Sequence, residues 1–312
     1  MKAATLRQLR VFVSAASHLS FARAAAELHL TAPAVSLQIA ELERHAGSPL
    51  FERLGRRVYL TPAGQSVLRA ATAVLAQLRS LEEELASQRG VDGGLLDVGV
   101  ISAGDYFFPQ LLAAFCARHK GVRVQLSVSN REELLNRLDH NQVDLGILGK
   151  PPEGSDFDAV AFAQHPIVLI AAPGHALAGR RRVPLARLAG EGFIAREQGS
   201  LTREAMDETL ARARIRPNVV IEAASNETIK QAVAAGFGIA FASLHAIGLE
   251  VEARRLAILD VTGFPVRRRW YAVHRRGKHL PAVARAFSAF LAEEGEHRIR
   301  RQLPRALAKM YA

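Results

Sequence analysis

The chain has 312 residues, 49% of them hydrophobic, and a formal net charge of +11. This length and apolar content predict roughly two or three domains, each with its own core. No stretch approaches the roughly 20 apolar residues of a membrane-spanning helix and no apolar signal segment follows Lys2, so we expect a cytoplasmic protein with no membrane partner. The single cysteine, Cys116, excludes an internal disulfide and any multi-cysteine metal site, and its apolar neighbours predict a buried, unreactive thiol.

Residues 1–61 predict three short helices followed by a hairpin. Apolar residues recur at helical period over residues 6–16, and Ser20 is suited to cap a second helix over residues 21–28. Thr31 is suited to cap a third helix, whose first turn contains Pro33; the proline costs no hydrogen bond there, because the first amides of a helix lack partners. Residues 50–60 then predict two short strands around a turn.

The outer end of the third helix and the tip of the hairpin are the predicted DNA-binding surfaces. A recognition helix presents its first turns to base edges, and a basic hairpin can follow the backbone or enter the minor groove. The candidate DNA contacts are Ala32, Pro33, Ser36, Leu37, Gln38, Arg53, Arg56 and Arg57. Each feature alone also occurs in proteins that never bind DNA, but their order and spacing together favour double-stranded DNA as the partner.

Residues 5–64 resemble the winged helix-turn-helix of the LysR-type transcriptional regulators. The resemblance implies that Pro33 and Ser36 approach the major groove and that Arg56 enters the minor groove. Ala32 stands where many members have Gln, and Leu37 where many have Arg or Met, so the bases that this helix reads stay open. Three later segments are similar to the subgroup that controls Calvin-cycle (RuBisCO) operons: VSNREELLNRL at 128–138, SNETIKQAV at 225–233 and RRWYAVHRRGK at 268–278. Control of a different metabolic operon is the alternative.

Residues 62–90 predict one long linker helix that pairs with a second copy of the chain. Its apolar residues alternate steps of four and three, which is the seam of a two-stranded coiled coil. The candidate dimerisation residues are Val67, Ala71, Val74, Leu78, Leu81 and Leu85. The alternative is a helix that packs on its own domain. The family resemblance implies a homodimer or a dimer of dimers.

Past a glycine-rich stretch at residues 90–94, apolar strands alternate with helices, which predicts an α/β fold with a parallel sheet. The resemblance implies a two-lobed domain like the periplasmic binding proteins, with 93–165 plus 268–295 as lobe I and 166–267 as lobe II. Residues 267–312 hold 12 Lys/Arg and 3 Asp/Glu. We expect 296–312 to be a basic tail, which either assists nonspecific DNA binding or is a solvated helix end.

An effector site is expected between the lobes, at the carboxyl ends of strands, where helix N-termini direct unpaired amides. Small polar residues and arginines open helices at three such points, and Asn226 opens another. The candidate effector contacts are Ser102, Asn130, Arg131, Thr202, Arg203 and Asn226. They favour an anionic small molecule: a sugar phosphate, another phosphorylated metabolite or a nicotinamide nucleotide. The competing interpretation is ordinary helix capping, because Ser, Asn and Thr cap helices in most proteins.

Catalytic patterns are missing from the sequence, which contains no complete dinucleotide fingerprint, no Walker motif and no metal-ligand spacing among its histidines. We therefore expect no enzyme, no metal and no cofactor. The expected function is an effector-responsive regulator that binds promoter DNA and controls access by RNA polymerase. Two further hypotheses stay open: a ligand-independent architectural DNA binder, and a binding protein whose helix-turn-helix is only a scaffold.

Overall fold

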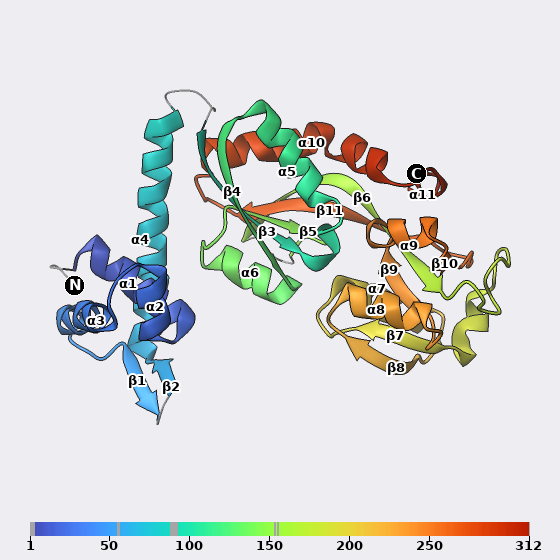
Figure 1. The fold of residues 1–312 in the computed structure, drawn as a ribbon, viewed down its shortest axis with the longest axis horizontal. Coiled ribbons are helices and arrows are strands. Elements are labelled where there is room, and N and C mark those ends of the chain that lie inside the picture. Colours follow the sequence, from blue (N-terminus) through green and yellow to red (C-terminus); the bar gives the residue numbers. More distant parts are fainter. Residues whose placement is uncertain (1–3, 55–56, 88–92, 153, 155, 312) are drawn as a thin grey trace. The chain divides into compact units, whose positions relative to one another are not determined.

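The computed structural model describes the chain except residues 1–3, 55–56, 88–92, 153, 155 and 312 (Figure 1). The chain divides into two compact units, one holding Met1–Leu85 and the other almost all of the chain from Ala86 onward. Within the described residues, no helix is both long enough and apolar enough to cross a bilayer.

The first unit begins with the three predicted helices and the hairpin. Their bounds are α1 Leu6–His18, α2 Phe21–Glu27, α3 Ala32–Ala46, β1 Phe51–Leu54 and β2 Arg57–Leu60. The two predicted caps are present: the side chain of Ser20 accepts a hydrogen bond from the Arg23 amide, and that of Thr31 accepts one from the Ala34 amide. These bonds satisfy amides that the helices themselves leave unpaired. The helix starts were therefore readable from the sequence.

A small core joins the three helices because alanines allow them to approach closely. Ala24 and Ala25 of α2 are buried against Val35 and Ile39 of α3. A second cluster, around Phe12, Leu42 and Leu50, connects the helices to the hairpin and to the next helix. Each large apolar side chain buried in this way contributes about 1.5–3 kcal/mol.

Helix α4 (Pro62–Ser87) packs its first turns on its own unit. Ala71 is buried there, and Val67, Leu68 and Leu75 pack beside it. Among the predicted pairing residues, Ala71 is thus covered by its own domain, whereas Val67 is only partly buried and its role in pairing stays a prediction. The physical reason is that helical spacing identifies an apolar face but not its partner, and the additional apolar residues Leu68 and Leu75 turn this face toward the helix's own domain.

The later turns of α4 leave part of the predicted seam open. The side chains of Val74 and Leu81 are 44% and 51% exposed, and Leu78 is partly buried. The side chain of Leu85 lies outside the described residues. The later turns of α4 therefore offer the more exposed surface for pairing with a second copy.

A mixed sheet forms the centre of the second unit (Figure 1). Its strand order is β10-β6-β11-β5-β3-β4, with β9 on β6. The strands are β3 Gly93–Ile101, β4 Gly121–Ser129, β5 Leu145–Leu148, β6 Phe157–Ala171, β9 Ala240–Ser243, β10 Ala257–Ile258 and β11 Val266–Arg275. Strands β3, β4 and β5 pair in parallel, as the alternation of strands and helices predicted, and β6, β9, β10 and β11 extend the sheet with antiparallel pairs. The chain leaves lobe I on β6 and returns on β11, and these two strands pair antiparallel along their length.

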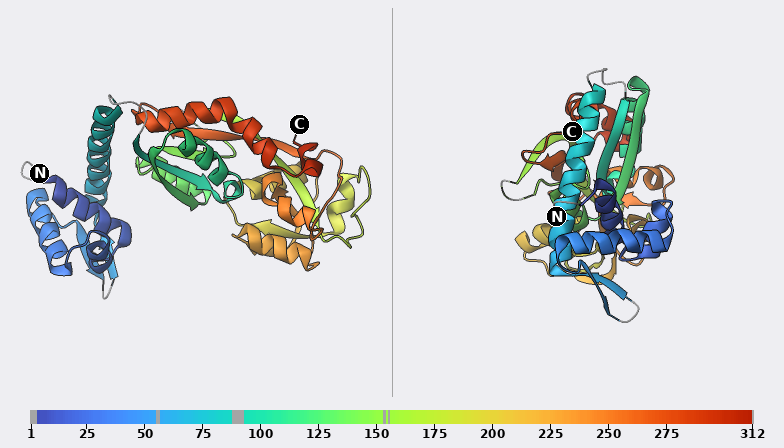
Figure 2. Two further views of the ribbon diagram at one scale, coloured as in Figure 1. Left: turned by 45° about the horizontal axis from the view of Figure 1, so that its top comes forward. Right: turned by 90° about the vertical axis from the view of Figure 1, so that its left-hand side faces the viewer.

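Helices α5 Phe108–Arg118, α6 Arg131–Asp139 and α10 Ala282–Gln302 complete lobe I. Helix α10 packs alongside α5 (Figure 2). Their aromatic rings meet edge to face, with the ring centroids of Phe108 and Phe287 5.8 Å apart. Cys116 of α5 is only partly buried, whereas the sequence predicted a buried thiol. It lies at the edge of the buried face of the helix. Partial burial still raises the pKa of its thiol.

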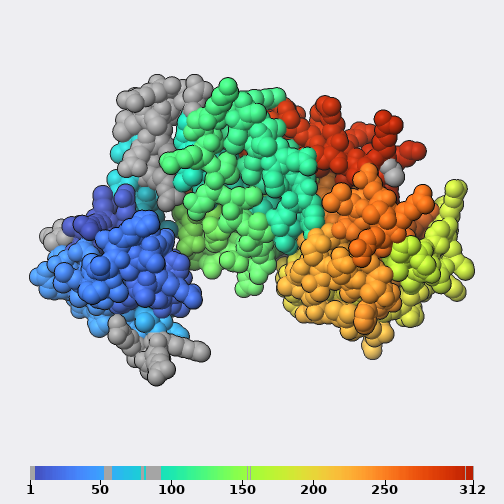
Figure 3. Space-filling view, in the orientation of Figure 1, coloured from blue at the N-terminus to red at the C-terminus, as the bar shows by residue number. Residues whose placement is uncertain are grey.

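The expected tail at 296–312 is instead part of the folded domain. Helix α10 continues through Gln302, and the short helix α11 (Arg305–Ala308) follows it. In the space-filling view of Figure 3, the red C-terminal segment lies against the surface of the domain. Ile299, Leu307 and Tyr311 are buried in the main core. These apolar side chains fix the segment, although arginines dominate its composition.

Lobe II contains a two-stranded parallel sheet, β7 Gly192–Arg196 with β8 Asn218–Ala223. Its helices are α7 Leu201–Arg212, α8 Asn226–Ala234 and α9 Gly248–Glu252, with short 3-10 helices η2 Leu185–Gly190 and η3 Leu244–Ala246; η1 Ser102–Gly104 belongs to lobe I. One cluster of buried apolar residues runs from lobe I into α8 and β9. The two lobes are therefore packed against each other in this structure.

Candidate DNA interface and effector site

The outer surface of α3 carries the predicted DNA contacts. Ala32 and Pro33 are exposed at its start, and Leu37 is 59% exposed, whereas Ser36 and Gln38 are partly buried. The opposite face of the helix is held in the core by Val35, Ile39 and Leu42. This arrangement presents one amide side chain, which can bond adenine in two places, and one apolar side chain, which can contact a thymine methyl group.

The base of the wing that follows is described with its side chains, but at positions 53, 54 and 57 only the backbone is described. Strands β1 and β2 pair antiparallel, with Arg53 opposite Val58. Arg56 and the side chains of Arg53 and Arg57 lie outside the described residues. Their contact with DNA stays a prediction from the sequence.

The polar ends of three elements meet at one small cavity between the lobes. Ser102 follows β3, Asn130 and Arg131 follow β4, and Thr202 lies in the first turn of α7. The cavity is lined by Ile101, Ser102, Ala103, Asn130, Arg131, His165, Arg196, Glu197, Ser200, Leu201 and Thr202. Four of the six predicted effector contacts are thus brought together, at the carboxyl ends of strands where binding sites of α/β sheets usually lie.

Arg196, at the end of β7, is the central cation of this cavity, and sequence reasoning missed it. Its side chain is 6% exposed and donates to Glu197 at 2.7 and 2.9 Å, to Asn226 Oδ1 at 2.6 Å and to Ser102 Oγ at 3.3 Å. The bond to Ser102 connects lobe II to lobe I. The predicted residue Asn226 does not line the cavity, but its bond to Arg196 connects it to the site. The sequence offered one signal for Arg196: it is a charged residue at the end of an apolar strand.

Arg203, which we predicted as an effector contact, is not among the residues that line the cavity. It donates to Asp207 Oδ2 at 3.1 Å, to Glu222 Oε2 at 2.7 Å and to the carbonyl oxygen of Arg196 at 3.0 Å. These bonds occupy the guanidinium because Asp207 follows it by one helical turn on the same face. Arg203 therefore holds the backbone of Arg196 in place and is not positioned to meet a ligand.

Arg131 has a hydrogen-bond donor to spare. Its Nη2 donates to the Pro151 carbonyl oxygen at 3.4 Å, while its buried Nε has no partner among the described residues. Asn130 Oδ1 accepts from the Glu133 amide at 2.8 Å and so caps α6. The cavity is lined by two guanidinium groups, those of Arg131 and Arg196, and by the starts of α6 and α7, which carry partial positive charge. Glu197 provides one carboxylate. The cavity therefore has an excess of positive potential.

A buried histidine forms the floor of the cavity. His165 is fully buried, its ring stacks on Trp270 with centroids 4.1 Å apart, and its Nε2 lies 3.1 Å from Ser243 Oγ. Burial, the neighbouring His245 and Arg268 hold the pKa of His165 well below its ordinary value, so the ring is neutral. A Cβ at Gly149 would lie 2.6 Å from His165 Nδ1 and 2.3 Å from Leu201. Only glycine permits this close approach.

The cavity offers little free space in this structure. Its free volume is about 20 Å³, which is room for about one water molecule. An organic ligand can enter only if Arg196 moves away from its partners or the lobes separate. Among the described residues, no group of three or more His, Cys, Asp or Glu side chains is arranged to hold a metal ion.

A helix-turn-helix joined to a two-lobed binding domain defines the class of ligand-responsive DNA-binding regulators. The family model of bacterial regulatory helix-turn-helix proteins of the LysR family matches residues 6–65, and the model of the LysR substrate binding domain matches residues 89–296. The chain belongs to the LysR family of transcriptional regulators. This membership confirms the predicted fold class and the expectation of a regulator rather than an enzyme.

The curated relatives confirm the predicted subgroup. The chain is 49% identical over 290 residues to a RuBisCO operon transcriptional regulator of Allochromatium vinosum, covering 93% of this chain and 96% of that one. It is 45% identical to the regulator CbbR of Rhodospirillum rubrum, with 92% and 95% covered. Among solved structures, the regulatory domain of CcmR from Synechocystis PCC6803 in complex with 2-PG matches with a TM-score of 0.62 and 39% identity, covering 64% of this chain and 96% of that one.

Proposed function

We propose that this chain controls carbon-fixation genes in response to a small phosphorylated anion that binds around Arg131 and Arg196. The observation that carries the proposal is the convergence of two guanidinium groups and two helix starts on one cavity. The names of the relatives support the target genes, and the complex of CcmR with 2-PG supports the effector class.

Binding would change the partners of Arg196. The guanidinium now donates to Glu197, Asn226 and Ser102. A phosphate would offer charged oxygen acceptors to Arg196 and to the free Nε of Arg131, and would displace the weaker bond to Ser102. Because Ser102 and Arg196 lie in different lobes, this exchange alters the free energy of lobe closure. A ligand that prefers one closure shifts the population toward it.

The DNA-binding end would act as a pair of reading heads. Two copies joined by the later turns of α4 place two α3 helices on an inverted repeat, as expected for dimeric helix-turn-helix proteins. The exposed Val74 and Leu81 support this pairing. A change in lobe closure would then alter the spacing of the heads on promoter DNA in the cytoplasm, and with it the access of RNA polymerase.

The test is a footprint of the full-length protein on the DNA upstream of its own gene, with and without 2-PG, sugar phosphates and reduced nicotinamide nucleotides. We expect an inverted repeat whose flanking protection changes with a phosphorylated compound. The variant Arg196→Gln should keep the footprint and shift the response to at least about tenfold higher ligand concentration, since a charge-assisted contact contributes about 1.5–3 kcal/mol. Arg212→Gln is the matched control, because Arg212 lies exposed at the end of α7, pairs with Glu208 and does not line the cavity.

An unchanged response of Arg196→Gln would contradict the assigned site. Protection that no ligand alters would favour the architectural DNA binder, and ligand binding without a footprint would favour the scaffold hypothesis. A footprint upstream of genes unrelated to carbon fixation would leave the conclusion of a DNA-binding regulator standing and would contradict the proposed target genes.

A further inference from the structure

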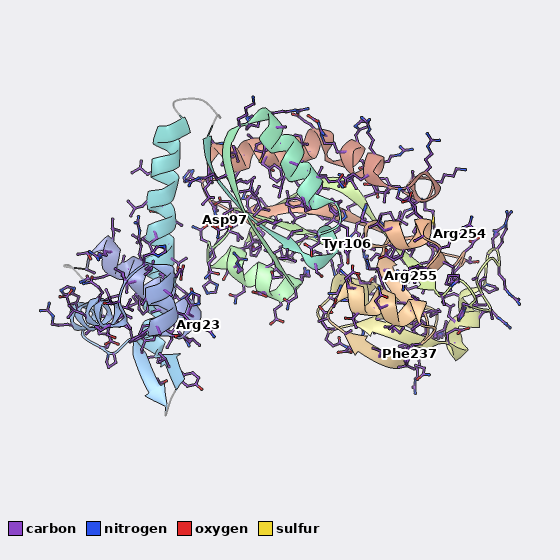
Figure 4. All side chains as sticks on the ribbon, in the orientation of Figure 1. Arg23, Asp97, Tyr106, Phe237, Arg254 and Arg255 are labelled. Atoms are coloured by element: carbon purple, nitrogen blue, oxygen red, sulfur yellow. The ribbon has the colours of Figure 1, made fainter. Side chains whose placement is uncertain are left out.

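A second, larger cavity lies between the lobes on the far side of the buried histidines. Its volume is about 530 Å³, within the range of about 300–1,000 Å³ that is usual for small-molecule sites. Tyr106 and Phe107 of lobe I form one wall, α8, η3 and α9 of lobe II form the next, and the end of α10 closes it. Figure 4 labels Tyr106 at this boundary of the lobes. The cavity shares none of its lining residues with the anion site.

The buried polar atoms of this cavity that lack a partner among the described residues are hydrogen-bond acceptors, while the exposed amide of Gln110 on the wall can both donate and accept. The buried Oε1 of Gln302 has no partner among the described residues, and the Glu252 carboxylate at the exposed rim makes no hydrogen bond or ion pair with them. His245, which is 7% exposed, places its Nε2 3.2 Å from the Gln164 carbonyl oxygen and leaves Nδ1 without a partner in the described structure. Because a carbonyl can only accept, Nε2 carries the proton and Nδ1 of the neutral ring is an acceptor.

The charge of the cavity also excludes anions. Lys230 is 5% exposed and already held, with its Nζ 2.6 Å from Glu227 Oε1, 2.7 Å from Glu250 Oε1 and 3.1 Å from the Ala246 carbonyl oxygen. Its ammonium also lies 4.7 Å from the centre of the Tyr106 ring. Three carboxylates, those of Glu227, Glu250 and Glu252, thus face one ammonium group. A ligand that donates hydrogen bonds and carries no negative charge is the one that fits.

Apart from Gln110, the rest of the wall is mainly apolar. Phe107, Ile299, Leu303 and Pro304 line it, and Leu249 stands at the rim with 78% of its surface exposed. Such a surface suits the flat body of an aromatic ring, with the donor group turned toward Gln302 and the rim carboxylate.

We propose that this cavity is a second ligand site, which takes a planar aromatic amine or amidine, uncharged or cationic. Its occupant differs in charge from the anion of the first site, so the two sites do not compete for one compound. They are connected by packed rings: Phe107 lies 5.0 Å from Trp270, and Trp270 stacks on His165 of the anion site at 4.1 Å. A ligand that shifts Phe107 therefore changes the packing behind His165.

The same rings supply the assay. Trp270 is the single tryptophan of the chain and is fully buried between the two cavities. Its fluorescence in the full-length protein should respond to benzamidine with a saturable change. Benzoate, which has nearly the same shape but carries a negative charge and no strong donor, should give no saturable change.

Two substitutions at the exposed rim test the location. Glu252→Lys reverses the rim charge, and Leu249→Arg adds a cation that competes for the carboxylates; each should raise the dissociation constant of benzamidine at least tenfold. Glu293→Lys is the matched control, because it makes the same charge change on the exposed surface of α10 away from the cavity. It should leave the dissociation constant within twofold of the wild-type value.

Three outcomes would overturn the proposal: no saturable response to benzamidine, equal responses to benzamidine and benzoate, or equal effects of Glu252→Lys and Glu293→Lys. The titration contains no phosphate ligand and no DNA, so its failure leaves the proposed regulation by an anion untouched. Failure of the Arg196→Gln experiment likewise leaves this second site standing.

Discussion

The buried histidine His245 should make the effector domain lose stability in mild acid. Burial lowers the pKa of its ring from 6.5 to about 4. Between these two values the unfolded chain binds a proton that the folded chain refuses, so stability falls as the pH decreases through this window and levels off below it. The linkage relation gives a loss of about 2 kcal/mol for this one group between pH 7.5 and pH 5. His165 acts in the same direction.

The variant His245→Gln isolates this contribution. Its amide nitrogen can still donate to the Gln164 carbonyl oxygen, but the side chain does not titrate. Urea unfolding followed by Trp270 fluorescence reports on this unit alone, because the first unit contains no tryptophan. We expect the stability difference between pH 7.5 and pH 5 to shrink by about 2 kcal/mol relative to the wild type.

The exposed His297 provides the matched control, and His297→Gln should keep the wild-type dependence on pH. If His245→Gln and the wild type lost stability in parallel down to pH 5, the assignment of a neutral buried ring at His245 would be refuted. The assignment of His245 Nδ1 as a hydrogen-bond acceptor in the second cavity would then be wrong as well.

Three further predictions concern the first unit. Gly64→Ala would place a Cβ 2.0 Å from the Leu50 carbonyl oxygen, so it should destabilise this unit by about 1–3 kcal/mol or more, as measured by thermal unfolding in circular dichroism. Leu81→Glu should raise the dissociation constant of a homodimer more than about a hundredfold in sedimentation equilibrium, because two apolar side chains of about 1.5–3 kcal/mol each leave the interface; an unchanged constant would exclude the later turns of α4 as that interface. Ser36→Ala should weaken binding to the specific site by about twofold to tenfold in a mobility shift, with unchanged folding, since it removes one hydrogen bond; equal affinity would argue against this contact.

Those parts of the fold that depend on local chemistry could be predicted from the sequence. Ser20 and Thr31 marked helix starts because a side-chain oxygen before an apolar run satisfies amides within a few residues. Ser102, Asn130 and Thr202 could be assigned to one cavity for a related reason: each is a polar residue at the carboxyl end of a strand or the start of a helix, and such ends converge in an α/β domain.

The errors arose where the partner was distant in the sequence. Arg203 looked as suitable for an anion as Arg131; its spacing of four residues from Asp207 indicated one local partner, but its bond to Glu222 on β8 was visible only in the structure. Arg196 carried no local signal of its role, since its partner Ser102 lies in the other lobe. The apolar face of α4 was visible, but the spacing of residues on one helix does not reveal which surface covers it.

The antiparallel pair of β6 and β11 also determines how this domain can fold. Pro166 and Arg267 are register partners, and the whole of lobe II lies between them in the chain. Strand β11 lies between β6 and β5 in the sheet, so the sheet of lobe I lacks a central strand until β11 has been added. A lobe II that is already folded holds these two positions together and removes most of the loop entropy that opposes their pairing. Although most of lobe I is synthesised before lobe II, lobe I can complete its core only after lobe II has folded and brought β11 back to β6.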